Sequence, residues 1–297
     1  MQTIFDDIRS GRIKKMILDT DTYNEVDDQF ALAYAMLSPE RVELLSVNAA
    51  PFLNDRSTSP LDGMEKSYEE IFKIMRMVDP NTTIPVYRGS VDYLVSKEEY
   101  QPSDACDNIV NTVMASDEPI YIVAIGAITN VASAIIKCPE VAKRAVLVWL
   151  GGTALHLPSA HEFNLMQDVK AAQVVFDSGI RMVQVPCEGV CTEFHTTIPE
   201  LEYYLRGKNE LCDYLIDIVA TYVPYTYAWS KVIWDVTAVA ALVRPEGEIM
   251  SLRPRPVLTD DERWDLSDDT RAPYVYVSKI WRDPIYADLF QKLANKA

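Results

Sequence analysis

Four aspartates close to the N-terminus have a spacing that could support chemistry. Asp19 and Asp21 follow a short apolar segment, and Asp27 and Asp28 open the amphipathic stretch that comes next. Two carboxylates 4 Å apart near a protein surface repel each other by about 4 kcal/mol. A divalent cation relieves that repulsion, and Ca²⁺ and Mg²⁺ both prefer hard oxygen ligands. The spacing therefore predicts a metal site that holds calcium or magnesium.

A simpler explanation covers part of this pattern. Asp27 and Asp28 alone could complement a helix N-terminus, which favours negative charge by about 0.3–1 kcal/mol for each residue. Asp19 and Asp21, buried together at the end of a strand, have no such explanation. The metal site is therefore the preferred interpretation.

The composition limits the classes of partner. The chain has 297 residues, of which 48% are hydrophobic, and a formal charge of −16. That charge argues against nucleic acid or an anionic membrane surface as the main partner. No stretch approaches the roughly 20 apolar residues that span a bilayer, and the N-terminus lacks the apolar core of a signal peptide. The five scattered cysteines match no metal or disulfide pattern, so we expect reduced thiols in a cytoplasmic protein.

The elements that position these residues alternate between strands and helices. Short, continuously apolar runs, typical of strands covered on both faces, occur at Lys15–Leu18, Val42–Val47, Ile84–Tyr87, Tyr121–Ile125, Ala145–Leu150 and Met182–Val185. Helical patterns follow at Asp27–Leu37, Gly63–Met77, Thr129–Lys137 and Val169–Ser178. Repeated strand–helix units predict an α/β fold with an open, mostly parallel, doubly wound sheet of the Rossmann-like type.

The character of the chain changes after about residue 199. Helical patterns at Glu210–Tyr222 and Asp235–Val243 are joined by aromatic-rich connections. A proline- and acid-rich stretch, Arg253–Asp269, precedes a strand expected at Tyr274–Val277. With no clean linker, we predict one domain over residues 1–297, with a helical C-terminal elaboration.

Ligands of open parallel sheets bind outside the carboxyl ends of the strands. Polar residues gather at that edge in the predicted topology: Asp19, Asp21, Asn48, Thr129, Asn130, Gly151, Gly152, Glu162 and Asn164. One edge of the sheet should therefore carry nearly all of the chemistry.

Four segments together resemble a known family. The D-x-D after the first strand, with D-D opening the next helix, is similar to ribonucleoside hydrolases of the inosine–uridine-preferring group and its relatives. GAITNVA at Gly126–Ala132, the segment Gly151–Gly179 with its GG, EFN and AA pairs, and WDVTAVAAL at Trp234–Leu242 resemble further family motifs in the same order. The resemblance spans roughly residues 14–245.

The resemblance implies a calcium site. Asp21 and Asp28 would bind Ca²⁺ together with the carbonyl of Thr129 and the carboxylate of Asp235. Asp21 would also be the general base for the attacking water, and Asp19 would support Asp21 from behind. By their position alone, Thr129 and Asp235 could instead belong to helix caps.

The resemblance also implies a nucleoside site. Asp27 and Asn164 would hold the ribose hydroxyls, and Glu162 would lie near the 5′ end of the sugar. Asn48 and Asn54 are both candidates for the asparagine that often ends the second-strand loop of the family, and Asn48 is taken as the substrate-binding residue. Asn164 could alternatively cap backbone groups of its loop. The implied substrate is a small-molecule nucleoside, and the implied assembly is a homodimer or homotetramer.

Acidic residues suit this reaction on general grounds. Cleavage of an N-glycosidic bond builds positive charge on the ribose, and neighbouring carboxylates stabilise that charge. A carboxylate beside the attacking water can accept its proton. The three histidines, His156, His161 and His195, match no metal spacing, so we expect them to be structural or solvated.

The sequence departs from the family pattern at two points. Five residues, 22–26, separate Asp21 from Asp27, two more than the family's usual D-x-D-P-G-x-D-D, so the turn must bulge, and Asn24 and Glu25 could contribute ligands. Trp234 stands where a histidine often precedes the late aspartate; in the purine-specific branch a tryptophan stacks on the base. A weak purine preference follows. Tyr225, Tyr227 and Trp229 could line the same pocket or belong to the core.

Two other functions remain to be compared. Haloacid-dehalogenase-type phosphatases also carry D-x-D after a strand and bind Mg²⁺, but Tyr23 stands where they have Thr or Val. A nucleoside- or ribose-binding protein that kept the metal site and lost turnover is the non-enzymatic alternative. The preferred function is calcium-dependent hydrolysis of ribonucleosides to ribose and free base.

Overall fold

The computed structural model describes residues 2–296 and is built around one twisted sheet. Within these residues the sheet has eight strands in the order β3-β2-β1-β4-β5-β6-β12-β9. Their bounds are β1 Lys14–Thr20, β2 Val42–Ala49, β3 Val86–Arg88, β4 Tyr121–Ala124, β5 Val146–Leu150, β6 Arg181–Val185, β9 Glu248–Pro254 and β12 Pro273–Ile280. Every neighbouring pair is parallel except β12 with β9. The predicted doubly wound α/β fold is confirmed.

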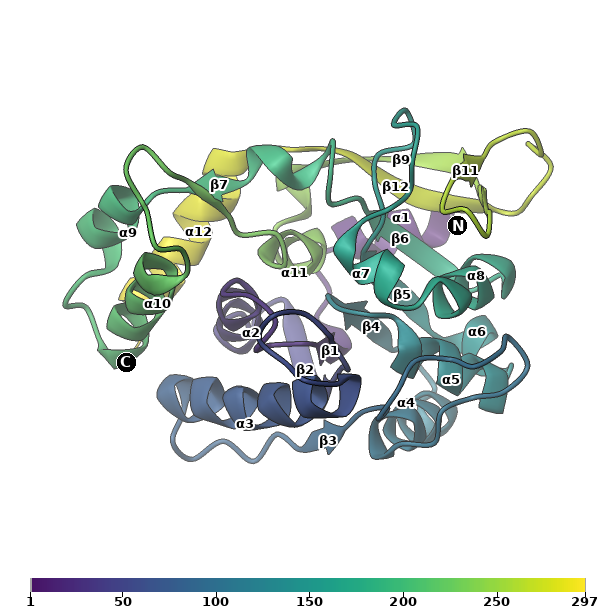
Figure 1. Cartoon of the computed structure of the whole chain (residues 1–297), viewed down its shortest axis with the longest axis horizontal. Helices are drawn as coiled ribbons and strands as arrows, with labels where there is room; N and C mark the ends of the chain where they lie inside the picture. The colour runs from purple at the N-terminus through teal and green to yellow at the C-terminus, as the bar shows by residue number, and fades with distance from the viewer. Residues whose placement is uncertain (1, 297) are drawn as a thin grey trace.

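Helices cover both faces of the sheet (Figure 1). Their bounds are α1 Gln2–Arg9, α2 Asp28–Met36, α3 Pro60–Val78, α4 Asp104–Ala115, α5 Thr129–Lys137, α6 Val141–Arg144, α7 Phe163–Gln167, α8 Val169–Asp177, α9 Ile198–Leu205, α10 Glu210–Thr221, α11 Val236–Val243 and α12 Arg282–Ala294. One apolar cluster joins α2, α3, α10, α11 and α12 to the sheet, and a second joins α4, α5 and α8. No helix within residues 2–296 is long and apolar enough to cross a bilayer.

The first strand shows why its sequence is continuously apolar. Met16 and Leu18 belong to the cluster on one face of the sheet, and Ile17 belongs to the cluster on the other. All three side chains have no exposed surface. A central parallel strand is buried on both faces, so it needs apolar residues at every position.

The strand order reverses direction between β1 and β4. From β1 the chain winds outward through β2 and β3, and then returns to the other side of β1 with β4, β5 and β6. Such a switch point opens a crevice at the carboxyl ends of the two central strands. Asp19 is opposite Asn48 of β2 and Ala124 of β4 in the register, so the first aspartates lie at that crevice.

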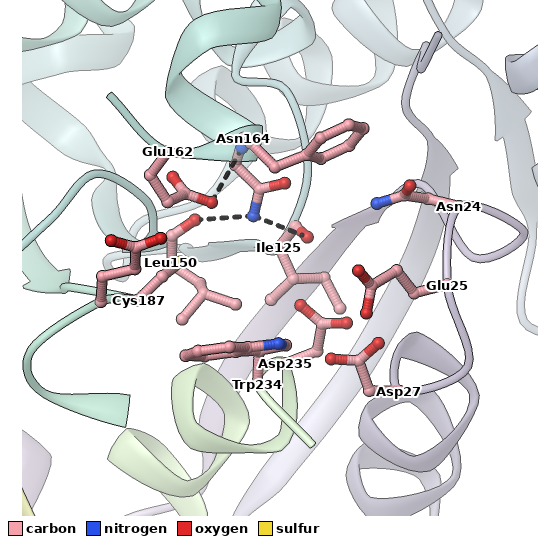
Figure 2. A pocket seen from close by; sticks show the side chains of 12 residues that line it. Asn24, Glu25, Asp27, Ile125, Leu150, Glu162, Asn164, Cys187, Trp234 and Asp235 are labelled. Atoms are coloured by element: carbon pink, nitrogen blue, oxygen red, sulfur yellow. Dashed lines mark hydrogen bonds between the residues drawn. The ribbon is translucent and has the colours of Figure 1, made fainter. Parts of the chain in front are cut away.

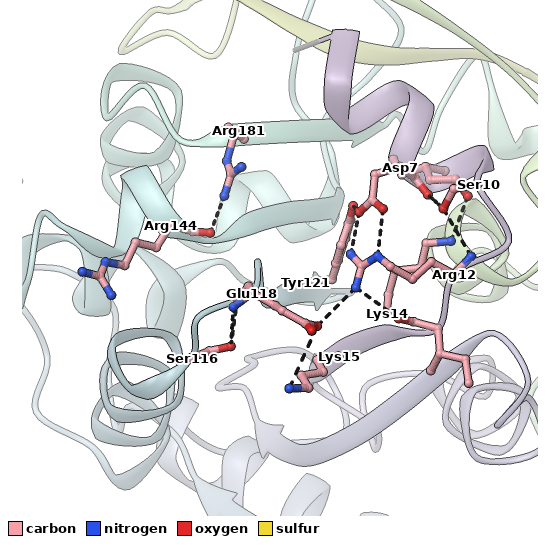
Figure 3. Close-up of polar contacts among 12 residues, drawn as sticks. Asp7, Ser10, Arg12, Lys14, Lys15, Ser116, Glu118, Tyr121, Arg144 and Arg181 are labelled. Carbon is pink, nitrogen blue, oxygen red and sulfur yellow. Dashed lines mark hydrogen bonds and ion pairs between the residues drawn. The ribbon is translucent and has the colours of Figure 1, made fainter.

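The opposite edge of the sheet is tied together by polar contacts (Figure 3). Arg12 forms an ion pair with Asp7 at 2.7 Å, and the Tyr121 hydroxyl donates to the same carboxylate at 2.6 Å. The fully buried Lys14 donates from Nζ to the Ile8 carbonyl at 3.0 Å. These contacts join α1 to the starts of β1 and β4, away from the crevice.

The C-terminal part is only partly helical. Helices α9, α10 and α12 pack together at one end of the molecule, as expected (Figure 1). The long strands β9 and β12 extend the sheet, and the short strands β10 Val257–Leu258 and β11 Trp264–Asp265 pair in the stretch that follows β9. Part of β12 was predicted from the sequence, but neither β9 nor α12 was, because charged residues interrupt the apolar pattern of both.

Candidate active site

A cavity of about 160 Å³ opens at the switch point. Its lining comes from the carboxyl ends of the central strands and the starts of three helices: Asn24, Glu25, Asp27, Ile125, Leu150, Glu162, Phe163, Asn164, Cys187, Glu188, Trp234 and Asp235. Figure 2 shows Glu25, Asp27 and Asp235 on one side and Glu162 with Asn164 across from them. The cavity therefore brings together residues that are more than 200 positions apart in the sequence.

Three buried aspartates lie close together beside this cavity. One carboxylate oxygen of each of Asp27, Asp28 and Asp235 lies within 4.8 Å of the others. Asp27 and Asp235 occupy the N-cap positions of α2 and α11, yet neither side chain makes a capping hydrogen bond. The capping alternative for Asp235 is therefore wrong. Neither carboxylate is held at the start of its own helix, and each lies beside that of Asp28.

Asp21 lies next to the trio but outside it. Its side chain has no exposed surface, and neither carboxylate oxygen has a hydrogen-bond partner among the described residues. Burial raises the pKa of Asp21 well above its usual value, and the nearby charges of Asp28 and Asp27 raise it further. A buried carboxylate without hydrogen bonds is costly, so Asp21 needs a proton or a cation.

Gly126 makes room for Asp21. A Cβ at this position would lie 2.8 Å from Cγ of Asp21, closer than real contacts allow. Gly126 opens the GAITNVA motif just after β4, so the backbone that follows β4 lies against the carboxylate. The lack of a side chain there is a steric requirement of the site.

The pKa values of the trio reflect the same crowding. Burial and the charge of Asp27 raise the pKa of Asp28 to about 7. Burial raises the pKa of Asp27 to about 6, a smaller rise because Lys231 opposes it. Burial, with the charges of Asp27 and Asp28, raises the pKa of Asp235 well above its usual range. A dication would remove this repulsion, and a donor set made only of oxygens suits a hard ion such as Ca²⁺ or Mg²⁺.

Asp19 and Asn48 lie opposite each other near the carboxyl ends of β1 and β2. Asn130 donates from Nδ2 to Asp19 Oδ2 at 3.0 Å, and burial raises the pKa of Asp19 to about 7. Asn48 is fully buried, and its Oδ1 accepts a hydrogen bond from Asn108 at 3.0 Å. Neither residue lines the cavity. The support that Asp19 was expected to give Asp21 stays a prediction, whereas Asn48 lies too deep to line the cavity as it stands.

Thr129 begins α5 and is also fully buried. Its hydroxyl donates to Asp168 Oδ2 at 2.8 Å, and Asp168 in turn caps α8 at the N–H of Ala171. The side chain thus has a structural partner. The predicted ligand is the Thr129 carbonyl, and that role stays a prediction.

Glu162 and Asn164 shape the opposite wall. Glu162 is the N-cap of α7, and its carboxylate accepts from the N–H groups of Gly152 at 2.7 Å, Asn164 at 2.9 Å and Leu165 at 3.3 Å. The Asn164 amide donates to the carbonyls of Leu150 at 3.1 Å and Ile125 at 3.3 Å (Figure 2). These bonds fix both side chains at the carboxyl ends of β4 and β5.

Two further residues at the site, Lys231 and Cys187, were not predicted from the sequence. Lys231 forms ion pairs with Glu25 and Asp27, and Cys187 lines the cavity beside Glu162. A single lysine in the aromatic stretch YTYAWSKVIWD was the only signal for the first. Nothing in the sequence distinguished Cys187 from the other thiols, all of which are free.

Other candidates lie elsewhere. All three histidines are exposed, as expected, and none lines the cavity. Tyr225 and Tyr227 are 71% and 80% exposed and do not line it, and Trp229 packs against the core. Trp234 lines the cavity and also packs against the core, so both of its predicted roles are compatible with its place.

Known proteins are similar to this chain in sequence and in fold. The family model described as inosine-uridine preferring nucleoside hydrolase matches residues 16–277. The non-specific ribonucleoside hydrolase RihC of Escherichia coli (strain SMS-3-5 / SECEC) is 29% identical over 260 residues, covering 80% of this chain and 81% of RihC. The pyrimidine-specific ribonucleoside hydrolase RihA of Escherichia coli O1:K1 / APEC is 25% identical over 279 residues, covering 84% and 82%.

A solved structure shares the fold across nearly the whole chain. The purine-preferring ribonucleoside hydrolase from Gardnerella vaginalis superposes with a TM-score of 0.79 at 20% identity, covering 95% of this chain and 98% of that one. The match exceeds half of the chain in both sequence and structure, and it excludes the phosphatase alternative. The chain therefore belongs to the inosine-uridine preferring nucleoside hydrolase family and is a ribonucleoside hydrolase, an N-glycosidase.

Proposed function

We propose that this protein hydrolyses the N-glycosidic bond of ribonucleosides in a calcium-dependent reaction, with a weak preference for purines. The observation that carries the calcium dependence is Asp21. Its two buried carboxylate oxygens have no hydrogen-bond partner among residues 2–296, and three further carboxylates lie beside it. A divalent cation matches that arrangement better than a shared proton, because one proton leaves most of the charge unbalanced.

The residues that would hold the cation are Asp21, Asp28, Asp235 and the carbonyl of Thr129. All four are oxygen donors, as calcium requires. When bound, the cation supplies positive charge that acidifies water and orients hydroxyl groups. Thr20 supports Asp28 by donating its hydroxyl to Oδ1, so Asp28 has one oxygen already fixed in place.

Asp21 acts as the general base. Its raised pKa reflects burial and the like charges of Asp28 and Asp27; with those charges balanced, the carboxylate would be ionised and able to accept a proton. Gly126 keeps the carboxylate close to the end of β4, where the crevice begins. Asp21 then takes the proton of the attacking water as the bond between ribose and base breaks.

The sugar lies between the two walls of the cavity. Asp27 and Asn164 accept hydrogen bonds from the ribose hydroxyls, Asn164 through Oδ1 because its amide group already donates to the Ile125 and Leu150 carbonyls, and Glu162 faces the 5′ end. The negative charge on the floor of the cavity stabilises the positive charge that develops on the ribose. Because Glu162 already accepts three backbone N–H groups, its main contribution is to fix the wall that holds Asn164.

Trp234 is the residue that contacts the leaving base. No histidine lines the described cavity, so stacking on the Trp234 ring is the interaction available to it. Stacking contributes about 0.5–1.5 kcal/mol beyond burial, and the larger purine ring gains more from it. The relatives are named for different base preferences although they share one fold, so the residues that line each cavity determine which base is preferred.

A nitrophenyl riboside assay with and without a chelator tests the function. We expect nitrophenol release with calcium and none after chelation, with activity recovered when calcium is restored. A protein that binds ribose without releasing nitrophenol at any calcium concentration would be the nucleoside-binding alternative, and the hydrolase proposal would fail. We further propose that the protein acts in the cytoplasm, where its five free thiols stay reduced, as a homodimer or homotetramer.

A further inference from the structure

A buried lysine lies behind the acidic floor of the cavity. Lys231 belongs to the two-residue strand β8, Lys231–Val232, just before α11, and is 6% exposed. Its Nζ forms an ion pair with Glu25 and lies 3.7 Å from Asp27 Oδ1. The ring of Tyr222, at the end of α10, lies 5.3 Å from the same nitrogen.

Glu25 belongs to the longer loop between Asp21 and Asp27. Its backbone is held from the other side, because Arg56 Nη1 donates to the Glu25 carbonyl at 2.8 Å. The neighbouring Asn24 accepts from Asn54 Nδ2 at 2.6 Å. The bulged loop is thus fixed between the segment that follows β2 and the lysine that precedes α11.

The position of Lys231 affects what Asp27 can bind. An oxygen of Asp27 lies close enough to oxygens of Asp28 and Asp235 to join them around one ion. The ammonium group attracts Asp27 Oδ1 from the other side. A buried lysine is costly unless carboxylates compensate it, so the pairing with Glu25 and Asp27 is what keeps Lys231 there.

We propose that Lys231 is a positioning residue that reserves Asp27 for the sugar. Paired with Lys231, Asp27 stays out of the cation's ligand set and keeps its other oxygen for a ribose hydroxyl. Glu25 fixes the ammonium group and thereby couples the longer loop to this role. The inference rests on the proposed function, because it assigns the sugar to Asp27 and the ion to the other aspartates.

The test compares Lys231→Met, Lys231→Arg and wild type. Ribose affinity is measured by calorimetry in saturating calcium, calcium affinity is measured without sugar, and KM and kcat are measured with nitrophenyl riboside. For Lys231→Met we expect ribose affinity to fall about tenfold, KM to rise to match, kcat to change less than about threefold, and calcium to bind more tightly. Lys231→Arg should recover most of the ribose affinity, because its charge still reaches both carboxylates.

Lys292→Met is the matched control. Lys292 also forms an ion pair with a glutamate, Glu40, and its side chain is 16% exposed, but it belongs to α12 and lies outside the cavity. We expect ribose and calcium affinities equal to those of wild type. Unchanged ribose affinity in folded Lys231→Met, or a parallel loss of calcium affinity, would overturn the inference. Either result would show that Lys231 does not keep Asp27 for the sugar and away from the cation.

Two further measurements keep the test decisive. If Lys231→Met does not fold, Glu25→Gln replaces it: we expect a smaller fall in ribose affinity with calcium binding retained, and equal ribose affinity refutes the inference. If wild type binds ribose but releases no nitrophenol, the hydrolase proposal fails. The ribose affinities of the variants still decide the role of Lys231, since they need no turnover.

Discussion

Asp27 and Asp235 occupy the same position, the N-cap, at the starts of two helices that are far apart in the sequence, and neither uses its carboxylate to cap. A capping side chain contributes about 0.5–2 kcal/mol, and the chain forgoes it at both helices. Each carboxylate instead lies within 4.8 Å of the other and of Asp28. The two helix N-termini therefore direct their acidic residues to one point.

Calcium should stabilise the folded chain, and more so at neutral than at acidic pH. Burial raises the pKa of Asp19 and Asp28 from 3.8 to about 7 and that of Asp27 to about 6. Without a cation, the folded chain holds more protons than the unfolded chain between about pH 4 and 7. Its free energy of unfolding therefore falls as pH rises through that window.

Bound calcium requires ionised carboxylates, so its stabilising effect grows over the same window. At a hundred times the dissociation constant the gain is about 2.7 kcal/mol. Thermal unfolding with and without calcium at pH 5 and pH 7.5 checks this, with Asp28→Asn as the variant that should lose the response. An equal shift at both pH values would contradict the prediction.

Asp21→Asn should abolish hydrolysis and leave the fold intact. Loss of a general base lowers kcat by about 10²–10⁴-fold, and the amide keeps the size of the carboxylate. The measurement is nitrophenyl riboside hydrolysis, with circular dichroism to confirm folding. Asp265→Asn, an exposed position outside the cavity, is the control and should retain full activity. Activity of Asp21→Asn near that of wild type would remove Asp21 as the base.

Gly126→Ala should reduce activity because the added methyl group displaces the Asp21 carboxylate. The added methyl group would lie 2.8 Å from Cγ of Asp21 and would push the carboxylate aside. We expect kcat to fall by at least about tenfold, because a misplacement of 1 Å can cost 10²-fold. Gly179→Ala adds a methyl group where no atom lies within 4 Å, so it controls for the loss of a glycine. Its activity should be normal even if its left-handed backbone lowers stability.

Trp234→Leu should lower activity on inosine more than on uridine. The loss of stacking corresponds to about 0.5–1.5 kcal/mol, or about 2- to 13-fold in kcat/KM. Trp234→Phe should retain part of the preference, because a smaller aromatic ring remains. The ratio of kcat/KM for the two nucleosides is the measurement. A ratio that is the same in wild type and Trp234→Leu would show that the base is selected elsewhere.

The architecture could be predicted because its signals are local. Continuous apolar runs marked β1, β4 and β5, and the helix Thr129–Lys137 was predicted with its observed bounds. The polar residues at the strand ends, Asp19, Asp21 and Asn164, follow from the same topology. In each of these cases the chemistry of a few neighbouring residues determines the element.

The rest depends on contacts between distant segments. Nothing near Lys231 in the sequence indicates Glu25 as its partner, because the two are 206 residues apart. The resemblance implies that Asp27 holds the sugar and Asp21 the ion, but the sequence could not indicate that Asp27 lies so close to Asp28 and Asp235, with Asp21 beside them. These details are set by how α2 and α11 approach each other, and the order of residues does not encode that directly.

Asn54 and Arg56 hold the longer loop through hydrogen bonds to Asn24 and Glu25, and this has an evolutionary consequence. Arg56 donates to the Glu25 carbonyl, so deleting two loop residues would leave that guanidinium group without its acceptor. Deletion of the two loop residues alone would thus destabilise the chain, and so would loss of Arg56 while the loop keeps its extra length. Loop length and residues 54 and 56 should accordingly change together among descendants of this sequence, as a single inherited unit.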